Sequence, residues 1–229
     1  DVFYVISGFL ITGLILKDQS FSFANFYARR AKRLLPASFL VLAVTSVSFW
    51  FLAPVISRSQ YSKDLVGSTW YVSNYLYAHW QNDYQNLGAT PSPLIHFWSL
   101  AVEEQFYLFW PLLISLTRRR LRISIPVVFS FSFLLSLYLV KTSPIFAFYS
   151  LPTRAFELSI GALLAIFPIR FKSTWIGLLA IALSLYIFDN HTAFPALPAL
   201  LPTLGALAVI SSTTENVFYH PFPLKRCCL

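Results

Sequence analysis

The chain has 229 residues, of which 57% are hydrophobic and only 11% are charged. Soluble domains carry about 25% charged residues, so the composition excludes a water-soluble globular protein and indicates one that lies largely in lipid. The net charge of +8 comes from short basic clusters between apolar runs, which is typical of the cytoplasmic loops of membrane proteins and excludes the continuous basic stripe of a nucleic-acid-binding protein.

Seven segments approach or reach the length of a spanning helix, which is about 20 mostly apolar residues. The third is unusual because it carries Glu103 and Glu104. In chain order the segments are residues 2–16, 34–53, 97–116, 123–140, 146–167, 175–188 and 196–210. We therefore predict an all-α integral membrane helical bundle of about seven spanning helices, which forms a single domain over residues 1–229.

The basic clusters give the predicted orientation. Alternating the seven segments across the bilayer places every cluster on one side, which is the cytoplasmic side by the positive-inside rule. The clusters are Lys17 to Arg33, Arg118 to Arg122, Arg170 with Lys172, and Lys225 with Arg226. We therefore expect a multi-pass protein of the bacterial inner membrane, with the lipid bilayer as its first partner.

The segment 64–80 does not fit this alternation. It has a helical pattern rich in Trp and Tyr, but serines, a threonine and an asparagine interrupt it. We interpret it as an interfacial or re-entrant segment, which its aromatic content suits. A full crossing is the alternative, and it would place all later basic clusters outside.

Several features exclude disulfide and metal chemistry and point to an incomplete domain. Cys227 and Cys228 are adjacent at the C-terminus, so no disulfide framework is expected; palmitoylation there is a weak possibility. The four histidines are far apart, and we expect no metal site. The chain has no methionine and starts at Asp1 inside an apolar segment, so we expect the first helix and the C-terminal helices of the domain to be missing.

The first cluster of candidate functional residues is the basic run 26–36. Arg30 and Arg33 are three residues apart and share one face of a helix. Two guanidinium groups on one face could clamp a phosphorylated ligand bidentately. The alternative is a plain topology signal.

The second cluster is the run 96–107. His96, Ser99 and Glu103 follow helical spacing and are predicted to form one polar stripe. A buried Glu103 needs a cation or a hydrogen-bond donor, and it could orient a base or hold a substrate hydroxyl. The alternatives are a structural ion pair for Glu103 and an interfacial position for His96. We assign Trp98, Ser99 and Tyr107 to the wall of a substrate cavity.

The third cluster is the run 148–158. Arg154 and Glu157 are three residues apart, so they could pair with each other, or Arg154 could reach across to Glu103. A salt bridge that only stabilises the bundle is the alternative to a role toward substrate. From the residues alone, the three clusters fit a membrane enzyme and a carrier equally well.

Four of these runs resemble the motifs of acyltransferase family three, the bacterial membrane O-acyltransferases. They occur in the family's order and with similar spacing, and together they cover residues 1 to about 165. The runs are residues 1–12 (DVFYVISGFLIT), 27–37 (YARRAKRLLPA), 96–108 (HFWSLAVEEQFYL) and 153–158 (TRAFEL).

The resemblance implies a helical membrane bundle that transfers an acyl group, usually acetyl, from cytoplasmic acyl-CoA to an envelope glycan such as lipopolysaccharide O-antigen or peptidoglycan. It implies that Arg30 and Arg33 contact CoA, and it matches Glu103 and Arg154 to polar positions inside the membrane. Acyl-CoA is the expected donor substrate, and no metal is expected. We assign catalytic roles to four residues: His96, Glu103, Arg154 and Glu157.

The resemblance also places the family's proposed catalytic histidine upstream of Asp1, so we expect this chain to be inactive alone. Two further interpretations stay open. The first is a carrier or flippase for a lipid-linked sugar or an acyl group, without bond chemistry. The second is a non-catalytic remnant of a broken gene.

Overall fold

The computed structural model describes residues 1–18, 21–80, 92–169, 173–189 and 192–213, and all regular secondary structure within these ranges is helical. The first half contains α1 (Val2–Lys17), α2 (Phe23–Leu52), the short 3₁₀ helix η1 (Val55–Ser57), α3 (Arg58–Thr69) and α4 (Ser73–His79). The second half contains α5 (Phe97–Leu116), η2 (Arg118–Arg120), α6 (Leu121–Thr142), α7 (Pro144–Tyr149), α8 (Leu151–Ile166), α9 (Thr174–Ile187) and α10 (Ala196–Thr213). The prediction of an all-α fold is confirmed.

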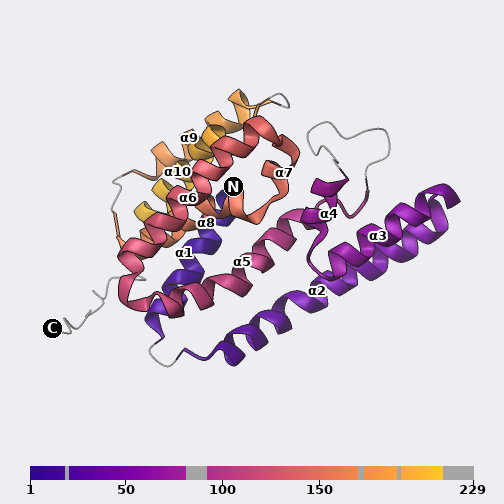
Figure 1. Ribbon diagram of the computed structural model, residues 1–229, viewed down its shortest axis with the longest axis horizontal. Coiled ribbons are helices and arrows are strands. Elements are labelled where there is room, and N and C mark those ends of the chain that lie inside the picture. Colours follow the sequence, from indigo (N-terminus) through magenta and orange to yellow (C-terminus); the bar gives the residue numbers. More distant parts are fainter. Residues whose placement is uncertain (19–20, 81–91, 170–172, 190–191, 214–229) are drawn as a thin grey trace.

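The bundle is built around α8, which packs against α1 on one side and α6 on another (Figure 1). Helices α9 and α10 pair with each other, and α10 also contacts α8 and α1. Helix α5 lies beside α1 and α4, whereas α2 lies along the outside of the molecule and packs mainly against α3. The core therefore gathers segments from both halves of the chain.

Two glycine pairs allow helices to pack backbone to backbone. A Cβ atom on Gly8 of α1 would collide with the carbonyl oxygen of Leu158 in α8, and one on Gly161 would collide with that of Val5. In the second pair, a Cβ atom on Gly177 of α9 would lie 2.6 Å from the carbonyl oxygen of Gly205 in α10. Small residues at such contacts are typical of helix packing in membranes, where lipid supplies no hydrophobic force between helices.

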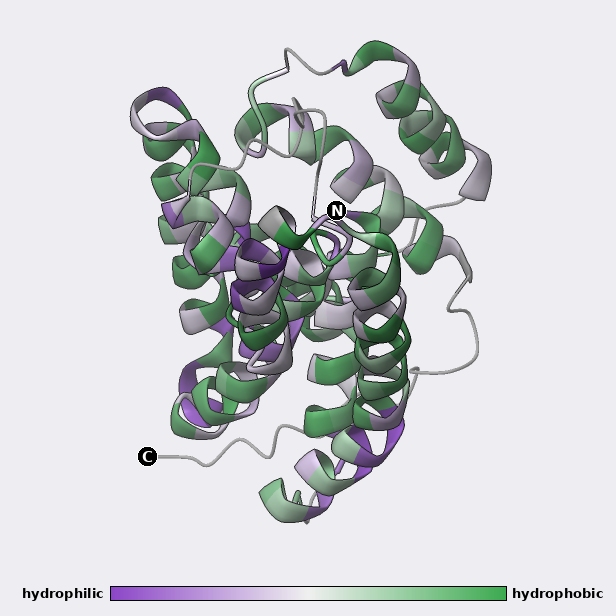
Figure 2. Ribbon diagram, turned by 90° about the vertical axis from the view of Figure 1, so that its right-hand side faces the viewer, coloured by the Kyte–Doolittle hydropathy of each residue, from purple (hydrophilic) through white to green (hydrophobic). Residues whose placement is uncertain are grey.

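The outer faces of the helices are apolar. Figure 2 shows hydrophobic residues along most of the length of the helices. Large exposed side chains on α2 include Leu40, Trp50 and Phe51, which are 65%, 61% and 80% exposed. A surface of this kind suits lipid and not water.

Within the described ranges, two stretches have both the length and the hydropathy of a membrane span: Phe23–Leu52 and Arg118–Thr142. Three further apolar helices are shorter: Val2–Lys17, Thr174–Ile187 and Ala196–Ser212. The structure thus supports two spans by these criteria, fewer than the seven predicted. Figure 1 shows that the C-terminal ends of α1 and α5 lie at the same end of the molecule as the N-terminal end of α2. Lys17 ends α1, and the three arginines of η2 directly follow α5.

Several predicted boundaries differ from the observed ones. Helix α2 begins at Phe23 and not at residue 34, because Ser22 caps it through the Asn25 amide and the basic run continues the helix. The predicted segment 146–167 is two helices that meet at Ser150; the second begins at Leu151 and has Pro152 in its first turn. Residues 64–80 form the end of α3 and all of α4, which meet near Tyr71, a non-glycine residue with φ of 55°. The basic residues at 170, 172, 225 and 226 and the two cysteines lie outside the described residues.

Candidate functional site

A buried carboxylate lies where α1 meets α5. Glu103 is 3% exposed, and its Oε1 accepts a hydrogen bond of 2.8 Å from the hydroxyl of Ser7 on α1. The hydroxyl of Tyr107, one turn further along α5, donates to Glu103 and also lies 2.7 Å from the Ser7 Oγ. Two hydroxyl groups therefore solvate the carboxylate in place of water, which a buried charge requires.

Arg30 extends this network to α2. Its guanidinium donates two hydrogen bonds to Glu104, of 2.9 Å from one terminal nitrogen and 3.4 Å from Nε. The same terminal nitrogen lies 3.7 Å from Glu103 Oε1, and the guanidinium covers the ring of Tyr107. One cation is thus shared between two carboxylates and an aromatic face.

Other polar contacts fix α5 against α1 and α2. The Trp110 indole nitrogen donates to the Thr12 hydroxyl at 2.8 Å, and the Tyr27 hydroxyl donates to the Leu108 carbonyl oxygen at 2.8 Å. Both contacts lie just after Tyr107 along α5, at Leu108 and Trp110. They fix the orientation of α5 about its own axis. In this orientation Glu103 faces α1 and Glu104 faces α2.

A second buried ion pair lies at the start of α8. Arg154 and Glu157 are 2% and 0% exposed, and they pair at 2.9 Å. Arg154 also pairs with Asp1 at 2.8 Å and donates from Nε to the Phe148 carbonyl oxygen at 3.0 Å. The predicted pairing of Arg154 with Glu157 within α8 is confirmed. The second partner of Arg154 is Asp1 and not Glu103.

An amide pair connects α4 to α5. Gln105 Nε2 donates to Asn74 Oδ1 at 2.9 Å and to the Tyr71 carbonyl oxygen at 2.9 Å. Asn74 in turn donates to the Tyr149 carbonyl oxygen at 3.1 Å. Since Gln105 directly follows Glu104, this pair ties the small α3–α4 lobe to the helix that carries the buried carboxylates.

The structure brings some of the predicted site residues together and keeps others apart. Glu103, Tyr107 and Arg30 meet in one network, whereas Arg33 is exposed one turn along α2. His96 is exposed at the start of α5, and the Ser99 hydroxyl donates to the His96 carbonyl oxygen at 3.1 Å. These two residues do not contact Glu103 through any bond that the structure gives. Trp98 is buried beside the second ion pair, with its ring centroid 5.5 Å from the Arg154 guanidinium carbon.

Sequence reasoning missed three partners in these clusters: Ser7, Glu104 as the main partner of Arg30, and Asp1. A signal for Ser7 does exist, because a small polar residue beside Gly8 inside an apolar helix is typical of a helix contact. The described part of the chain holds no group of three or more His, Cys, Asp or Glu residues that could bind a metal ion.

A helical bundle with apolar outer faces and a buried polar network between three of its helices defines a membrane protein with a polar centre. The chain belongs to acyltransferase family three, because the family model described as an acyltransferase domain matches residues 1–223. No solved structure matches the chain.

The chain is also similar to curated relatives, some of which are named as O-acetyltransferases. An uncharacterized protein of Haemophilus influenzae is 33% identical over 247 residues, which cover 94% of this chain and 98% of the relative. Peptidoglycan O-acetyltransferase OatA of Listeria monocytogenes is 37% identical over 72% of this chain and 28% of its own length. O-acetyltransferase OatA of Staphylococcus aureus is 41% identical over 53% of this chain and 21% of its own length. The chain therefore spans less than a third of these two transferases.

Proposed function

We propose that this chain is the membrane domain of an O-acyltransferase that moves an acetyl group from cytoplasmic acyl-CoA to a hydroxyl of a cell-envelope polysaccharide. The similarity to relatives named as peptidoglycan O-acetyltransferases favours peptidoglycan over lipopolysaccharide as the acceptor. The observation that carries the proposal is the network of Ser7, Arg30, Glu103, Glu104 and Tyr107, which places charged groups between three apolar helices. Charged residues at membrane depth are costly, and they are retained mainly for function.

The proposed reaction is direct acyl transfer. An acceptor hydroxyl oxygen attacks the thioester carbonyl carbon, its proton passes to a general base, and the carbon–sulfur bond breaks so that CoA leaves as a thiolate. The family resemblance assigns the base to a histidine upstream of Asp1. Within this chain, Glu103 orients the reacting groups through the hydroxyls of Ser7 and Tyr107, and Arg154 with Glu157 shapes the cavity.

The proposed donor site lies at the basic end of α2. Arg33 is exposed and follows Arg30 by three residues, so the two guanidinium groups lie on neighbouring positions of one helical face. Arg33 is the freer of the two to hold a CoA phosphate, while Arg30 holds Glu104 in place. This division of roles predicts that Arg33→Ala raises the apparent KM for acyl-CoA more than it lowers kcat.

The test uses the full-length gene in a strain from which it has been deleted. Acetate released by mild alkali from purified wall polysaccharide is measured for the wild type, for Glu103→Gln and for Lys32→Ala, an exposed residue of the same basic run. We expect Glu103→Gln to lower acetylation by about 10²-fold or more, within the range of general acid–base and orienting effects. We expect Lys32→Ala to match the wild type.

Two outcomes would contradict the proposal. If glycan acetylation is unchanged by deletion while export of the glycan falls, the protein is a carrier. If Glu103→Gln is as active as the wild type at equal protein level, the buried network has no part in the reaction.

A further inference from the structure

Helix α7 ends at Tyr149, and side chains from two other helices hold the carbonyl oxygens of its last two residues. Arg154 Nε donates to the Phe148 carbonyl oxygen at 3.0 Å, and Asn74 Nδ2 donates to the Tyr149 carbonyl oxygen at 3.1 Å. The last carbonyl groups of a helix have no partner within it and need one from elsewhere. The end of α7 therefore joins Arg154 on α8 to Asn74 on α4.

A second step leads from Asn74 to the helix that carries the buried carboxylates. Gln105 Nε2 donates to Asn74 Oδ1 at 2.9 Å, and Asn74 Nδ2 lies 3.4 Å from Gln105 Oε1. The two amides thus bond to each other in both directions. Gln105 directly follows Glu104 on α5. A chain of hydrogen bonds and one peptide link therefore runs from Arg154 to Glu104.

The same glutamine holds the joint between α3 and α4. Gln105 Nε2 also donates to the Tyr71 carbonyl oxygen at 2.9 Å, and the Tyr71 hydroxyl donates to Ser38 on α2 at 2.9 Å. Tyr71 has φ of 55°, a left-handed conformation that a residue other than glycine keeps where its surroundings impose it. Residues of this kind cluster at functional sites. The joint is therefore held from α5 and from α2 at once.

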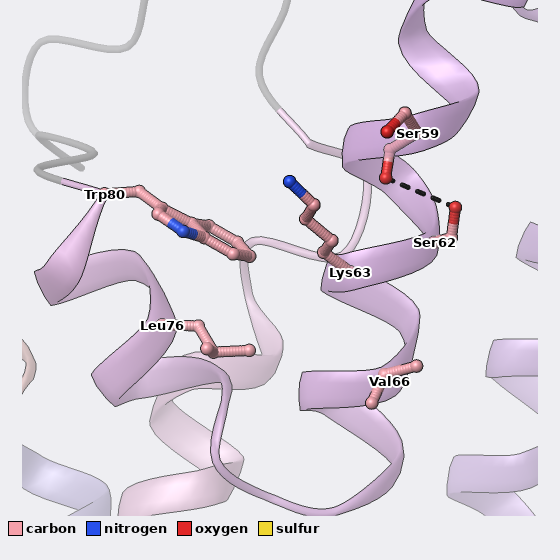
Figure 3. Close-up of a pocket in the computed structure, with 6 residues that line it drawn as sticks. All are labelled: Ser59, Ser62, Lys63, Val66, Leu76 and Trp80. Carbon is pink, nitrogen blue, oxygen red and sulfur yellow. Dashed lines mark hydrogen bonds between the residues drawn. The ribbon is translucent and has the colours of Figure 1, made fainter.

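The amide pair lies on the inner side of α4. Asn74 is 0% exposed, and α4 packs against both α5 and α7 (Figure 1). Figure 3 shows the other side of α4, where Leu76 and Trp80 line an open groove with exposed residues of α3. These two residues follow Asn74 by two and six positions, which places them on the opposite face of the helix. The groove therefore takes no part in the chain of hydrogen bonds.

Two neutral amides suit a place between two charged clusters. An amide donates and accepts hydrogen bonds and carries no charge, so it can hold two helices at one distance without altering the charge balance on either side. A buried polar network in which every member has a partner makes the core rigid and specifies one arrangement. The pair therefore sets a spacing and supplies no chemistry of its own.

We propose that Asn74 and Gln105 are positioning residues for acyl transfer, which set the spacing between the cluster around Glu103 and the cluster around Arg154. The inference rests on the proposed function, in which Glu103 orients the reacting groups and Arg154 shapes the cavity around them. A displacement of about 1 Å, caused by a change far from the chemistry, can lower a rate about 10²-fold. Losing the pair should therefore slow the reaction, although neither amide touches donor or acceptor.

The first experiment measures the kinetics of acetylation by the purified full-length protein, with kcat expressed per folded molecule. We expect Asn74→Leu, which keeps the shape of the side chain but not its hydrogen bonds, to lower kcat by about 10- to 10²-fold. The KM for acyl-CoA should stay unchanged, because the proposed donor residue Arg33 lies outside this chain of bonds. The matched control is Asn25→Leu, the same exchange at an exposed asparagine of α2, which should match the wild type in both constants.

The second experiment needs no activity and uses Gln105→Met, which changes a half-exposed residue and keeps the length of its side chain. Hydrogen exchange of backbone amides reports local opening. In the described structure, hydrogen bonds link Gln105 to the α7–α8 joint at Ser150 only through Asn74. We expect the amides around Ser150 to exchange up to about tenfold faster in this variant, which corresponds to the loss of one hydrogen bond. Its kcat per folded molecule should fall as in Asn74→Leu.

The outcomes separate this inference from the proposed function. If the wild type acetylates, and both variants keep its kcat per folded molecule while their thermal midpoints fall, the pair only stabilises the fold and the positioning role is overturned. Unchanged exchange around Ser150 in Gln105→Met would also overturn it, because the two clusters would not be connected. A wild type that never acetylates would overturn the proposed function, whereas faster exchange around Ser150 in that protein would still support the connection.

Discussion

Arg30 of α2 and Glu104 of α5 are joined by two parallel hydrogen bonds, of 2.9 Å and 3.4 Å. The pair is half-buried, and each side chain is about one-fifth exposed, at 18% and 20%. Such a fork-to-carboxylate geometry is specific to arginine, because lysine offers a single point of attachment. This pair is one of the side-chain contacts that attach α2 to α5, together with the bond from Tyr27 to the Leu108 carbonyl oxygen.

Replacing Arg30 by lysine keeps the positive charge but removes the two-point contact with Glu104, so the effect of the geometry on stability can be measured by itself. We expect Arg30→Lys to destabilise the protein by up to about 1.5–3 kcal/mol, the range for hydrogen bonds to charged groups, although the positive charge is kept. The thermal midpoint in detergent reports this loss, with Lys32→Arg as the control for a change on the exposed side of the helix. An unaltered midpoint in Arg30→Lys would mean that the second hydrogen bond contributes nothing.

The two kinds of glycine contact predict different costs for adding a methyl group. In Gly8→Ala the new Cβ meets the backbone carbonyl of Leu158, which cannot move without shifting α8. In Gly67→Ala it meets the end of the flexible Leu76 side chain. We expect Gly8→Ala to cost about 1–3 kcal/mol or more, as overpacking does, and Gly67→Ala to cost less. The free energies of unfolding of the two variants, measured side by side, check this order.

The buried pair of Arg154 and Glu157 predicts strong non-additivity. Arg154→Met leaves Glu157, which is 0% exposed, without its main cation, and removing one partner of a buried pair costs about 3–5 kcal/mol. The double variant Arg154→Met with Glu157→Leu removes both charges and should be more stable than Arg154→Met alone. A double variant whose loss equals the sum of the two single losses would show that the charges do not interact.

Asp64 predicts a dependence of stability on pH. Burial raises the pKa of its carboxyl above the ordinary value of 3.8, so the folded protein holds this proton more tightly than the unfolded chain does. The stabilisation is therefore full below the unfolded pKa and is lost as pH rises through the folded pKa. Asp64→Asn keeps the acceptor oxygen but has no charge to bury. Its thermal midpoint should rise relative to the wild type as the pH increases from about 4; a constant difference at all pH values would contradict the assignment.

Most of the helices could be predicted from the apolar runs of the sequence, because a stretch of about 20 apolar residues in lipid has few alternatives to a helix. The same signal failed at residues 23–33, where a polar and basic run belongs to α2, and at Ser150, where a short turn divides one apolar stretch. Hydropathy reports neither a helix that continues through polar residues nor a turn inside an apolar stretch.

The candidate site was predicted in part, because its charged members stand out in an apolar chain. Glu103 and Arg154 are such residues, and both are buried in ion networks. Ser7 could not be paired with Glu103 in advance, because the two are 96 residues apart and their contact depends on how α1 lies on α5. The predicted stripe of His96, Ser99 and Glu103 does not share one environment, because His96 is the exposed N-cap of α5 and Glu103 lies in the core.

The helices of this bundle differ in the kind of contact that holds them to their neighbours. Helices α1 and α8 touch backbone to backbone at Gly8 and Gly161, so separating them would open a contact that no side-chain rotation can relieve. Helix α2 is fastened to α5 and to the α3–α4 lobe through side chains such as Arg30, Tyr27 and Ser38. Side-chain attachments stretch and re-form at low cost, so mechanical compliance concentrates at α2, the helix that carries the proposed donor site.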